Sequence, residues 1–357
     1  MAGFTGFVLS RARAHRLLLA AALLTVLLTT AVLATFAAYS GAIGDAALRH
    51  SLRDPRTAAD ATLVVRSEVS PDGRPAVDAA VRAQAREAFA GLPAATVRSL
   101  ARSGPYALPR SLQPAAERSG DPDLTYFAAL DLGQVRLVTG RLPAATASGD
   151  LEAALPEAAA RRLGLKPGAR LTLADRLGGP KVTVRITGLY RPAHADAPYW
   201  RLDDLGGRGV RKAGFTMYGP LLAGPGVLAG DRVSAGPTGW QVSADFATLT
   251  TGRIGALRDA VGDAAAALRK TTAADGAPEV TTALPATLDR IERSLLVARS
   301  TLLVAALQLT LLAGYALLLV ARLLSSERAA ETRLLRARGG SRARIAGLAA
   351  TEALLLA

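Results

Sequence analysis

The chain has 357 residues, of which half are hydrophobic, and a formal net charge of +14. It contains no cysteine, so a domain exposed to an oxidising compartment would fold by core burial without disulfides. The positive charges flank apolar stretches or are scattered, with no basic stripe interleaved with aromatic residues, which argues against nucleic-acid binding.

The N-terminal part of the chain has the pattern of a membrane anchor. Residues 1–16 contain Arg11, Arg13 and Arg16 and no acidic residue, which predicts a cytoplasmic N-terminus. Residues 17–44 contain no charged residue and predict the first transmembrane helix. A cleaved signal peptide is the alternative. Its apolar region would span about 7–15 residues, and we favour an uncleaved anchor because this stretch is longer and a second apolar stretch follows.

Residues 45–299 are expected to form an external α+β domain. Periodicity predicts helices over 76–90, 155–164 and 251–269, and strands over 61–66, 124–132, 135–138 and 240–244. Alternation around 171–173 and 182–186, with Gly-Gly-Pro between, predicts a β-hairpin. A Pro- and Gly-rich loop is expected at 102–122. If the segment holds two domains rather than one, we place the boundary near 190–240.

A second helical element follows the external domain. Leu284, Leu288, Ile291 and Leu295 recur at 4-3-4 spacing, which predicts a helical stalk that packs against the extension of the first span. The stalk leads into residues 300–321, a stretch of 22 residues without a charge. As a helix it would be about 33 Å long, enough to cross a hydrocarbon core of about 30 Å. We therefore predict the second transmembrane helix there.

The C-terminal flank contains seven arginines in residues 322–344, and so predicts a cytoplasmic loop. The positive-inside rule then places residues 45–299 on the extracytoplasmic side. We therefore expect a plasma-membrane protein with several spans. Within the loop, 325–338 is expected to be helical, with its acids first and its arginines last as the helix dipole favours. Gly339-Gly340 ends that helix, and residues 345–357 are expected to begin a third transmembrane helix that is truncated here.

The cytoplasmic run ERAAETRLLRARGGSRARIAGLAATEALLL resembles the loop and third-helix entry of FtsX-like permeases, the MacB-like class of ABC transporter permeases. The matching loop residues are Glu331, Leu334, Leu335, Arg336, Gly339, Gly340 and Arg342, and Glu352 matches at the entry to the third helix. In the external domain, Gly140-Arg141-Leu142-Pro143, then EAALPEAAARRLGLKPGARLTL, then VTVRITGLYRP are similar to the periplasmic core domain of that family.

The resemblance implies a fold of membrane α-helical spans plus an external α+β domain of the MacB-like periplasmic core type on a helical stalk. It also implies that the loop is a coupling helix that docks on a cytoplasmic ABC ATPase subunit. The chain would work as a homodimer, or as a pseudo-dimer with a second permease half, in contact with membrane lipid. Substrates of such systems tend to be lipids, lipoproteins, peptides or antibiotics.

No catalytic or cofactor site is expected in this chain. It has no G-x-x-x-x-G-K-[ST] motif, so ATP is expected on the partner subunit and the chain itself is not expected to be an enzyme. The three histidines, His15, His50 and His194, are far apart in sequence, which argues against a metal site. Two alternatives stay open: a non-transporting scaffold that regulates an external cell-wall hydrolase, and a membrane sensor that acts without an ATPase.

Overall fold

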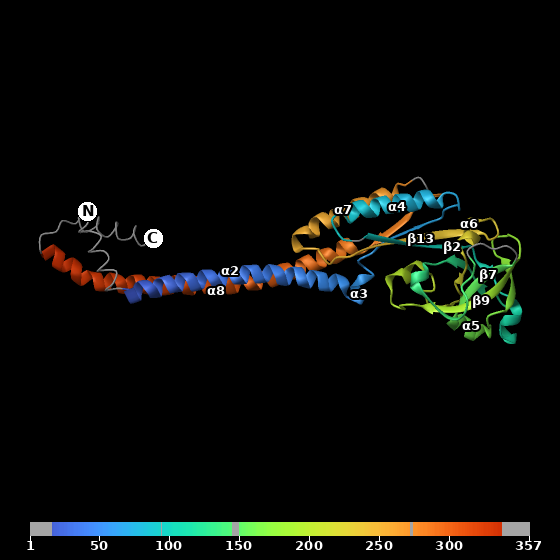
Figure 1. Cartoon of the computed structure of the whole chain (residues 1–357), viewed down its shortest axis with the longest axis horizontal. Coiled ribbons are helices and arrows are strands. Elements are labelled where there is room, and N and C mark those ends of the chain that lie inside the picture. Colours follow the sequence, from blue (N-terminus) through green and yellow to red (C-terminus); the bar gives the residue numbers. More distant parts are fainter. Residues whose placement is uncertain (1–15, 94, 145–149, 272–273, 338–357) are drawn as a thin grey trace. The chain divides into compact units, whose positions relative to one another are not determined.

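The computed structural model describes residues 16–93, 95–144, 150–271 and 274–337 (Figure 1). The helices are α2 Arg16–Arg53, α3 Pro55–Ala58, α4 Arg74–Ala88, α5 Glu157–Leu163, α6 Pro225–Ala229, α7 Ile254–Arg269 and α8 Leu284–Ala337. Short 3₁₀ turns are η1 Arg110–Leu112, η2 Ala115–Glu117, η3 Leu132–Gln134, η4 Pro198–Leu202 and η5 Thr251–Arg253.

The first strands along the chain are β1 Leu63–Ser67, β2 Ala95–Ser103, β3 Tyr106–Ala107, β4 Leu124–Thr125, β5 Phe127–Ala129, β6 Val135–Gly140 and β7 Leu151–Pro156. The later ones are β8 Arg170–Asp175, β9 Val182–Pro192, β10 Val210–Lys212, β11 Thr216–Tyr218, β12 Leu221–Leu222, β13 Ala235–Ala244 and β14 Glu279–Thr282. Within the described ranges they pair in the order β10-β11-β4-β3-β8-β9-β7-β12-β5-β2-β13-β1-β14, and β6 pairs with β9.

The chain divides into two compact units, and the first consists of residues 1–44 and 293–357. Its described part is helical, and leucines such as Leu23 and Leu303 expose more than 60% of their surface. Two helices, Leu23–Arg53 and Leu284–Leu319, are long and apolar enough to cross a membrane. Because so many leucines are exposed on these helices, the helices are suited to an apolar environment such as a membrane.

Hydroxyl groups within these two helices bond to their own backbone. Thr29 donates to the carbonyl of Thr25 at 2.7 Å, and Thr310 donates to that of Ala306 at 2.8 Å. Ser300 donates to the carbonyl of Leu296 at 2.9 Å. This i−4 bonding leaves these hydroxyls satisfied without water, as a hydrocarbon environment requires.

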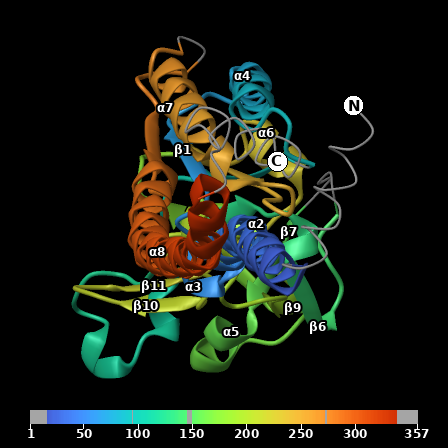
Figure 2. The same ribbon diagram turned by 90° about the vertical axis from the view of Figure 1, so that its left-hand side faces the viewer.

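The second unit, Asp45–Glu292, is a mixed α+β sheet domain. Helices α4 and α7 lie side by side over one face of the sheet at its β2-β13-β1-β14 end (Figures 1 and 2). Trp240 of β13 lies on this face, where its indole N–H donates to Asp78 of α4 at 3.1 Å. On the opposite face, η4 inserts Tyr199 and Trp200, which are at most 3% exposed, against Leu100 of β2.

Two helix predictions for this unit are confirmed. Val77, Val81, Ala85 and Phe89 all point inward from α4 or its C-terminal cap, as their spacing of four residues predicts. In α7 the predicted apolar face is buried, and consists of Ile254, Leu257, Val261, Ala265 and Leu268. The N-terminal three residues of the expected helix form η5 instead.

The predicted hairpin is also confirmed. Strands β8 and β9 pair antiparallel, with Leu171 opposite Val184 and Leu173 opposite Val182. The helix before the hairpin, α5, ends at Gly164, whose φ of +67° is the left-handed C-cap conformation that glycine adopts without strain.

Three predictions were wrong in detail. The 102–122 segment is not a continuous loop, because Tyr106–Ala107 forms strand β3 beside β4 and β8. Leu155 belongs to β7 rather than to the helix after it, since the strand is held by parallel pairing to β9 through Pro156. The 190–240 segment does not separate two units, because β10 to β13 join it to the same sheet.

The Gly140-Arg141 motif has a clear structural role. Gly140 has a φ of +77°, and a Cβ there would lie against the carbonyl oxygen of Thr187 in β9. Arg141 then forms a two-pronged ion pair with Glu152 of β7, at 2.8 and 2.5 Å, and Arg185 of β9 reaches the same carboxylate at 2.6 Å. The motif therefore fastens the turn after β6 to the β7–β9 pair.

The two arginines lower the pKa of Glu152 from 4.5 to about 2, Arg141 contributing most. Because the folded pKa is the lower one, Glu152 stabilises the domain above pH 4.5, and this contribution is lost as the pH falls toward 2. We expect Glu152→Gln to lower the urea midpoint at pH 5, and to do so less at pH 3. Tryptophan fluorescence measures this cleanly, because Trp200 and Trp240 are the only tryptophans in the chain.

Glu157→Gln is the matched control for this comparison, because Glu157 makes a single, longer ion pair with Arg161, at 3.8 Å. If Glu152→Gln lowered the urea midpoint by the same amount at pH 5 and pH 3, the result would contradict a stabilising role for the ionised carboxylate of Glu152.

Candidate functional site

The last turns of α2 hold the segment that leads from β13 into α7. The carboxylate of Asp45 accepts hydrogen bonds from the backbone N–H of Thr251, at 2.8 Å, and from its hydroxyl, at 2.9 Å. One helical turn later, Arg49 donates to the carbonyl of Ala247 at 3.3 Å. Arg53 then pairs with Asp245 at 3.4 Å. Three residues at four-residue spacing thus make these contacts from one face of the helix.

The first turns of α8 hold α7 itself. The guanidinium of Arg258 lies 2.6 Å from the carboxylate of Asp289 and 3.2 Å from that of Glu292. Asp289 is the main reason that the pKa of Arg258 is raised above its ordinary value. The same first turns of α8 also bury Leu284 and Leu288, which have no exposed surface.

Helix α7 is in turn fixed to the rest of the domain. Arg253 donates to the carbonyls of Ala90 and Gly91, both at 3.1 Å, and so joins the start of α7 to the end of α4. Phe246 packs edge-on against Phe89 with ring centroids 6.4 Å apart. We call the residues that link α2 and α8 to this part of the domain the helix joint. They are Asp45, Arg49, Arg53, Thr251, Arg258, Asp289 and Glu292. It connects the domain-side end of α2 to the segment just before α7, and the domain-side end of α8 to α7 itself.

No protein-family model and no curated protein sequence matches this chain. Among solved structures, it has similarity to the crystal structure of the periplasmic region of MacB from Actinobacillus actinomycetemcomitans. The two share 11% sequence identity, the match covers 66% of this chain and 92% of the other, and the TM-score is 0.29. A TM-score at this level does not establish a shared fold.

The predicted stalk residues lie in the first turns of α8, on the same part of the helix as the helix-joint residues Asp289 and Glu292. Leu284 and Leu288 are fully buried in the domain, whereas Ile291 and Leu295 are half-buried. That α8 begins at Leu284 and continues as one helix to Ala337 agrees with the predicted passage from stalk to span. The packing of the stalk against the first span stays a prediction.

The predicted coupling residues lie at or beyond the end of the described chain. The backbone of α8 includes Glu331, Leu334, Leu335 and Arg336, whose side chains are not described. Gly339, Gly340 and Arg342 lie outside the described residues, as does the expected start of a third span. Over the part of the chain that the structure does describe, no group of three or more His, Asp or Glu side chains could hold a metal ion.

Most of the helix joint was not found from the sequence. Asp45 and its partner Thr251 are 206 positions apart, so no local pattern connects them. Arg258 gave a weak signal, as a charged residue beside the apolar face of a predicted helix. The spacing of Asp45, Arg49 and Arg53 was readable, but solvated helix faces show the same spacing.

Proposed function

We propose that this chain is the permease subunit of an ABC-type exporter or mechanotransmission complex. In this complex, a partner ATPase on the cytoplasmic side of the plasma membrane drives movement of the domain on the opposite side. The observation that carries the proposal is the helix joint, in which the ends of both long apolar helices hold successive parts of one stretch of the domain, residues 245–258. A displacement of α8 along its axis would pull on α7 through the ion pairs of Arg258, and a displacement of α2 would pull on the segment just before α7.

Helix α8 also links the helix joint to the predicted coupling residues. Its 54 residues run without interruption from the joint residues to Leu334 and Leu335. In our proposal these two leucines, with Glu331, Arg336, Gly339, Gly340 and Arg342, dock on the ATPase, which alone binds and hydrolyses ATP. Two copies of the chain, or one copy and a second permease half, would form the membrane part, in contact with lipid.

Co-purification tests this proposal. The full chain, solubilised from its native membrane, should bring down an ATP-binding subunit, and Leu334→Asp should reduce that yield at least tenfold. A tenfold loss corresponds to about 1.4 kcal/mol of binding free energy, a modest demand on a carboxylate buried at an interface. Leu177→Asp is the matched control, because Leu177 lies in the external domain and is 63% exposed.

Two results would contradict the proposal. One is a wild-type chain that brings down no ATP-binding subunit. The other is a Leu334→Asp variant that retains the subunit as well as Leu177→Asp does.

A further inference from the structure

Strand β6 forms an open edge of the sheet. In the described ranges it pairs with β9 alone, and Arg136 lies directly opposite Arg191. In an antiparallel ladder the backbone groups of successive residues point alternately toward the partner strand and away from it. The hydrogen bond from the N–H of Ala193 to the carbonyl of Gln134 fixes this alternation, so the N–H and C=O of Leu137 point away from β9. An added strand would meet these two groups.

Apolar side chains are exposed along this edge. Leu137 exposes 39% of its surface and Val138 40%, and Leu132, in the turn η3 just before the strand, exposes 56%. An unpaired edge with such side chains is a template for another strand. The register shifts between Leu137 and Thr139, which leaves the pairing of residues 135–137 regular. These three residues therefore offer ordinary ladder geometry beside exposed apolar groups.

Two arginines face each other across the same strand pair. Because Arg136 and Arg191 are opposite in the β6–β9 ladder, their side chains leave the same face of the sheet, and both are exposed. Like charges in this position destabilise a sheet. Among the described residues, neither side chain has an ion pair or a hydrogen bond. We call these two residues the arginine pair.

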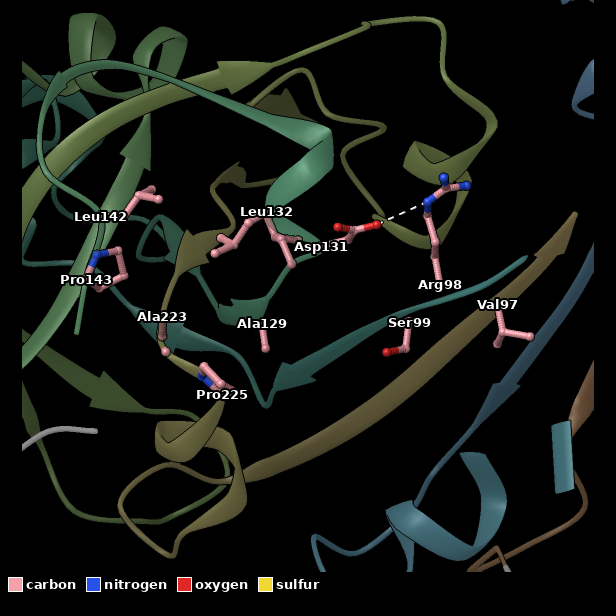
Figure 3. Close-up of a pocket in the computed structure, with 12 residues that line it drawn as sticks. Val97, Arg98, Ser99, Ala129, Asp131, Leu132, Leu142, Pro143, Ala223 and Pro225 are labelled. Carbon is pink, nitrogen blue, oxygen red and sulfur yellow. Dashed lines mark ion pairs between the residues drawn. The ribbon is translucent and has the colours of Figure 1, made fainter. Parts of the chain in front are cut away.

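Acidic residues on the elements around β6 do not neutralise the arginine pair. The carboxylate of Asp131, just before η3, pairs with Arg98 at 3.1 Å (Figure 3). The carboxylate of Glu152 on β7 is held by two other arginines. Asp196, in the loop after β9, makes no ion pair with either member in the described part of the chain. The counter-charge is therefore left for another molecule to supply.

Protection of the edge against aggregation explains only half of the arginine pair. A charge on an edge strand keeps other strands away, and Arg136 on β6 would serve that purpose. Arg191 is on β9, an inner strand that pairs with β6, β7 and β8, where a charge protects no edge. A second copy of the chain is disfavoured as the occupant, because pairing β6 with β6 would gather four arginines at one seam. An incoming acidic strand has the opposite effect.

We propose that the outer edge of β6 binds an extended acidic segment of a partner protein, which joins the sheet as an antiparallel strand. The backbone of the segment would bond to the N–H and C=O of Leu137. Since the backbone groups of Arg136 point to β9, the residue opposite Arg136 on the added strand belongs to a non-hydrogen-bonded pair, in which side chains are closest. A carboxylate at that position would lie beside Arg136, with Arg191 one strand further.

The register also sets the pattern of the segment. Residues of the added strand on either side of the acid face the other side of the sheet, where they would cover Leu137. Acidic and apolar residues should therefore alternate. This surface goes beyond the proposed coupling function, since it belongs to the sheet domain and needs no ATPase.

Peptide binding to the full chain in phosphatidylcholine nanodiscs tests the proposal without nucleotide or ATPase. The probe is a fluorescent peptide of alternating valine and glutamate, and the comparison peptide has glutamine in place of each glutamate. We expect the acidic peptide to bind at least tenfold more tightly by fluorescence polarisation, and to slow hydrogen–deuterium exchange in residues 135–140. A third peptide, with N-methylated valines, keeps the charges but lacks the N–H groups that face β6, so it should not bind.

Two variants separate the arginine pair from a general attraction to a basic chain. Arg136→Gln and Arg191→Gln should each lose the preference for glutamate over glutamine. Neither should lower the urea midpoint, because each removes one member of a like-charge pair. Arg86→Gln is the control and should keep the preference, since Arg86 is exposed on α4 and bonds to the backbone of its own helix.

Equal binding of the glutamate and glutamine peptides, unchanged exchange in residues 135–140, or tight binding of the N-methylated peptide would overturn the proposal. A preference that survives in both Arg136→Gln and Arg191→Gln, or that is lost equally in Arg86→Gln, would do the same. Because no ATPase is present, any of these results would leave the proposed coupling function standing.

Discussion

In the complex that we propose, an Arg258→Glu variant should lose the nucleotide-driven movement of the external domain while the ATPase continues to hydrolyse ATP. The substitution places a third carboxylate beside Asp289 and Glu292, so that attraction between α7 and α8 becomes repulsion. The base of the domain would then no longer follow the helix. The readout is the distance between spin labels at position 263 in two copies of the chain, with and without ATP.

The cysteine-free sequence makes this experiment direct, since Asp263→Cys introduces a single labelling site. Adding Asp289→Arg to Arg258→Glu should restore part of the movement, because the pair is then re-formed with its signs exchanged. Lys270→Glu is the control, a charge reversal at the exposed C-terminal end of the same helix. An Arg258→Glu complex that moves as the wild type does would show that the ion pair does not transmit the motion.

Gly140→Ala should be among the most destabilising single substitutions in the sheet domain, Asp45–Glu292. The left-handed backbone alone costs an alanine about 1–3 kcal/mol. In addition, the new Cβ would meet the Thr187 carbonyl oxygen and lie 2.8 Å from the Cα of Gly188, both backbone atoms that cannot rotate away. Urea denaturation followed by tryptophan fluorescence measures the loss.

Gly164→Ala separates the two causes of this loss. Gly164 has a similar φ of +67°, but a Cβ there would meet no atom within 4 Å. The difference between the two variants therefore measures the clash with β9. Equal midpoints for Gly140→Ala and Gly164→Ala would mean that the turn after β6 shifts without cost.

The sequence was informative where one element carries its own pattern. Helices α4 and α7 were readable because their apolar residues recur with the helical period and are buried by one sheet. Strand β2 was missed, because its residues ATVRSLARS mix small and cationic side chains, and only Leu100, Ala101 and Ser103 among them are buried. Its place in the sheet comes from pairing with β13, which no local pattern encodes.

The candidate sites were less predictable than the helices. The helix joint is assembled from segments that are far apart in the chain, such as Asp45 with Thr251 and Arg53 with Asp245. Arginines on their own are common in this sequence, so only the fold shows which of them face an acid and which do not. The Gly140-Arg141 motif was found by resemblance, and the structure supplies its physical reason.

The most direct test of the account is the inter-copy distance at Asp263→Cys in the wild-type complex with its ATPase, reconstituted in nanodiscs. We predict that the distance distribution shifts when ATP is added to a hydrolysis-deficient ATPase, and returns when the nucleotide is removed. Identical distributions with and without ATP, in a complex whose ATPase demonstrably binds it, would contradict the claim that this chain transmits motion to its external domain.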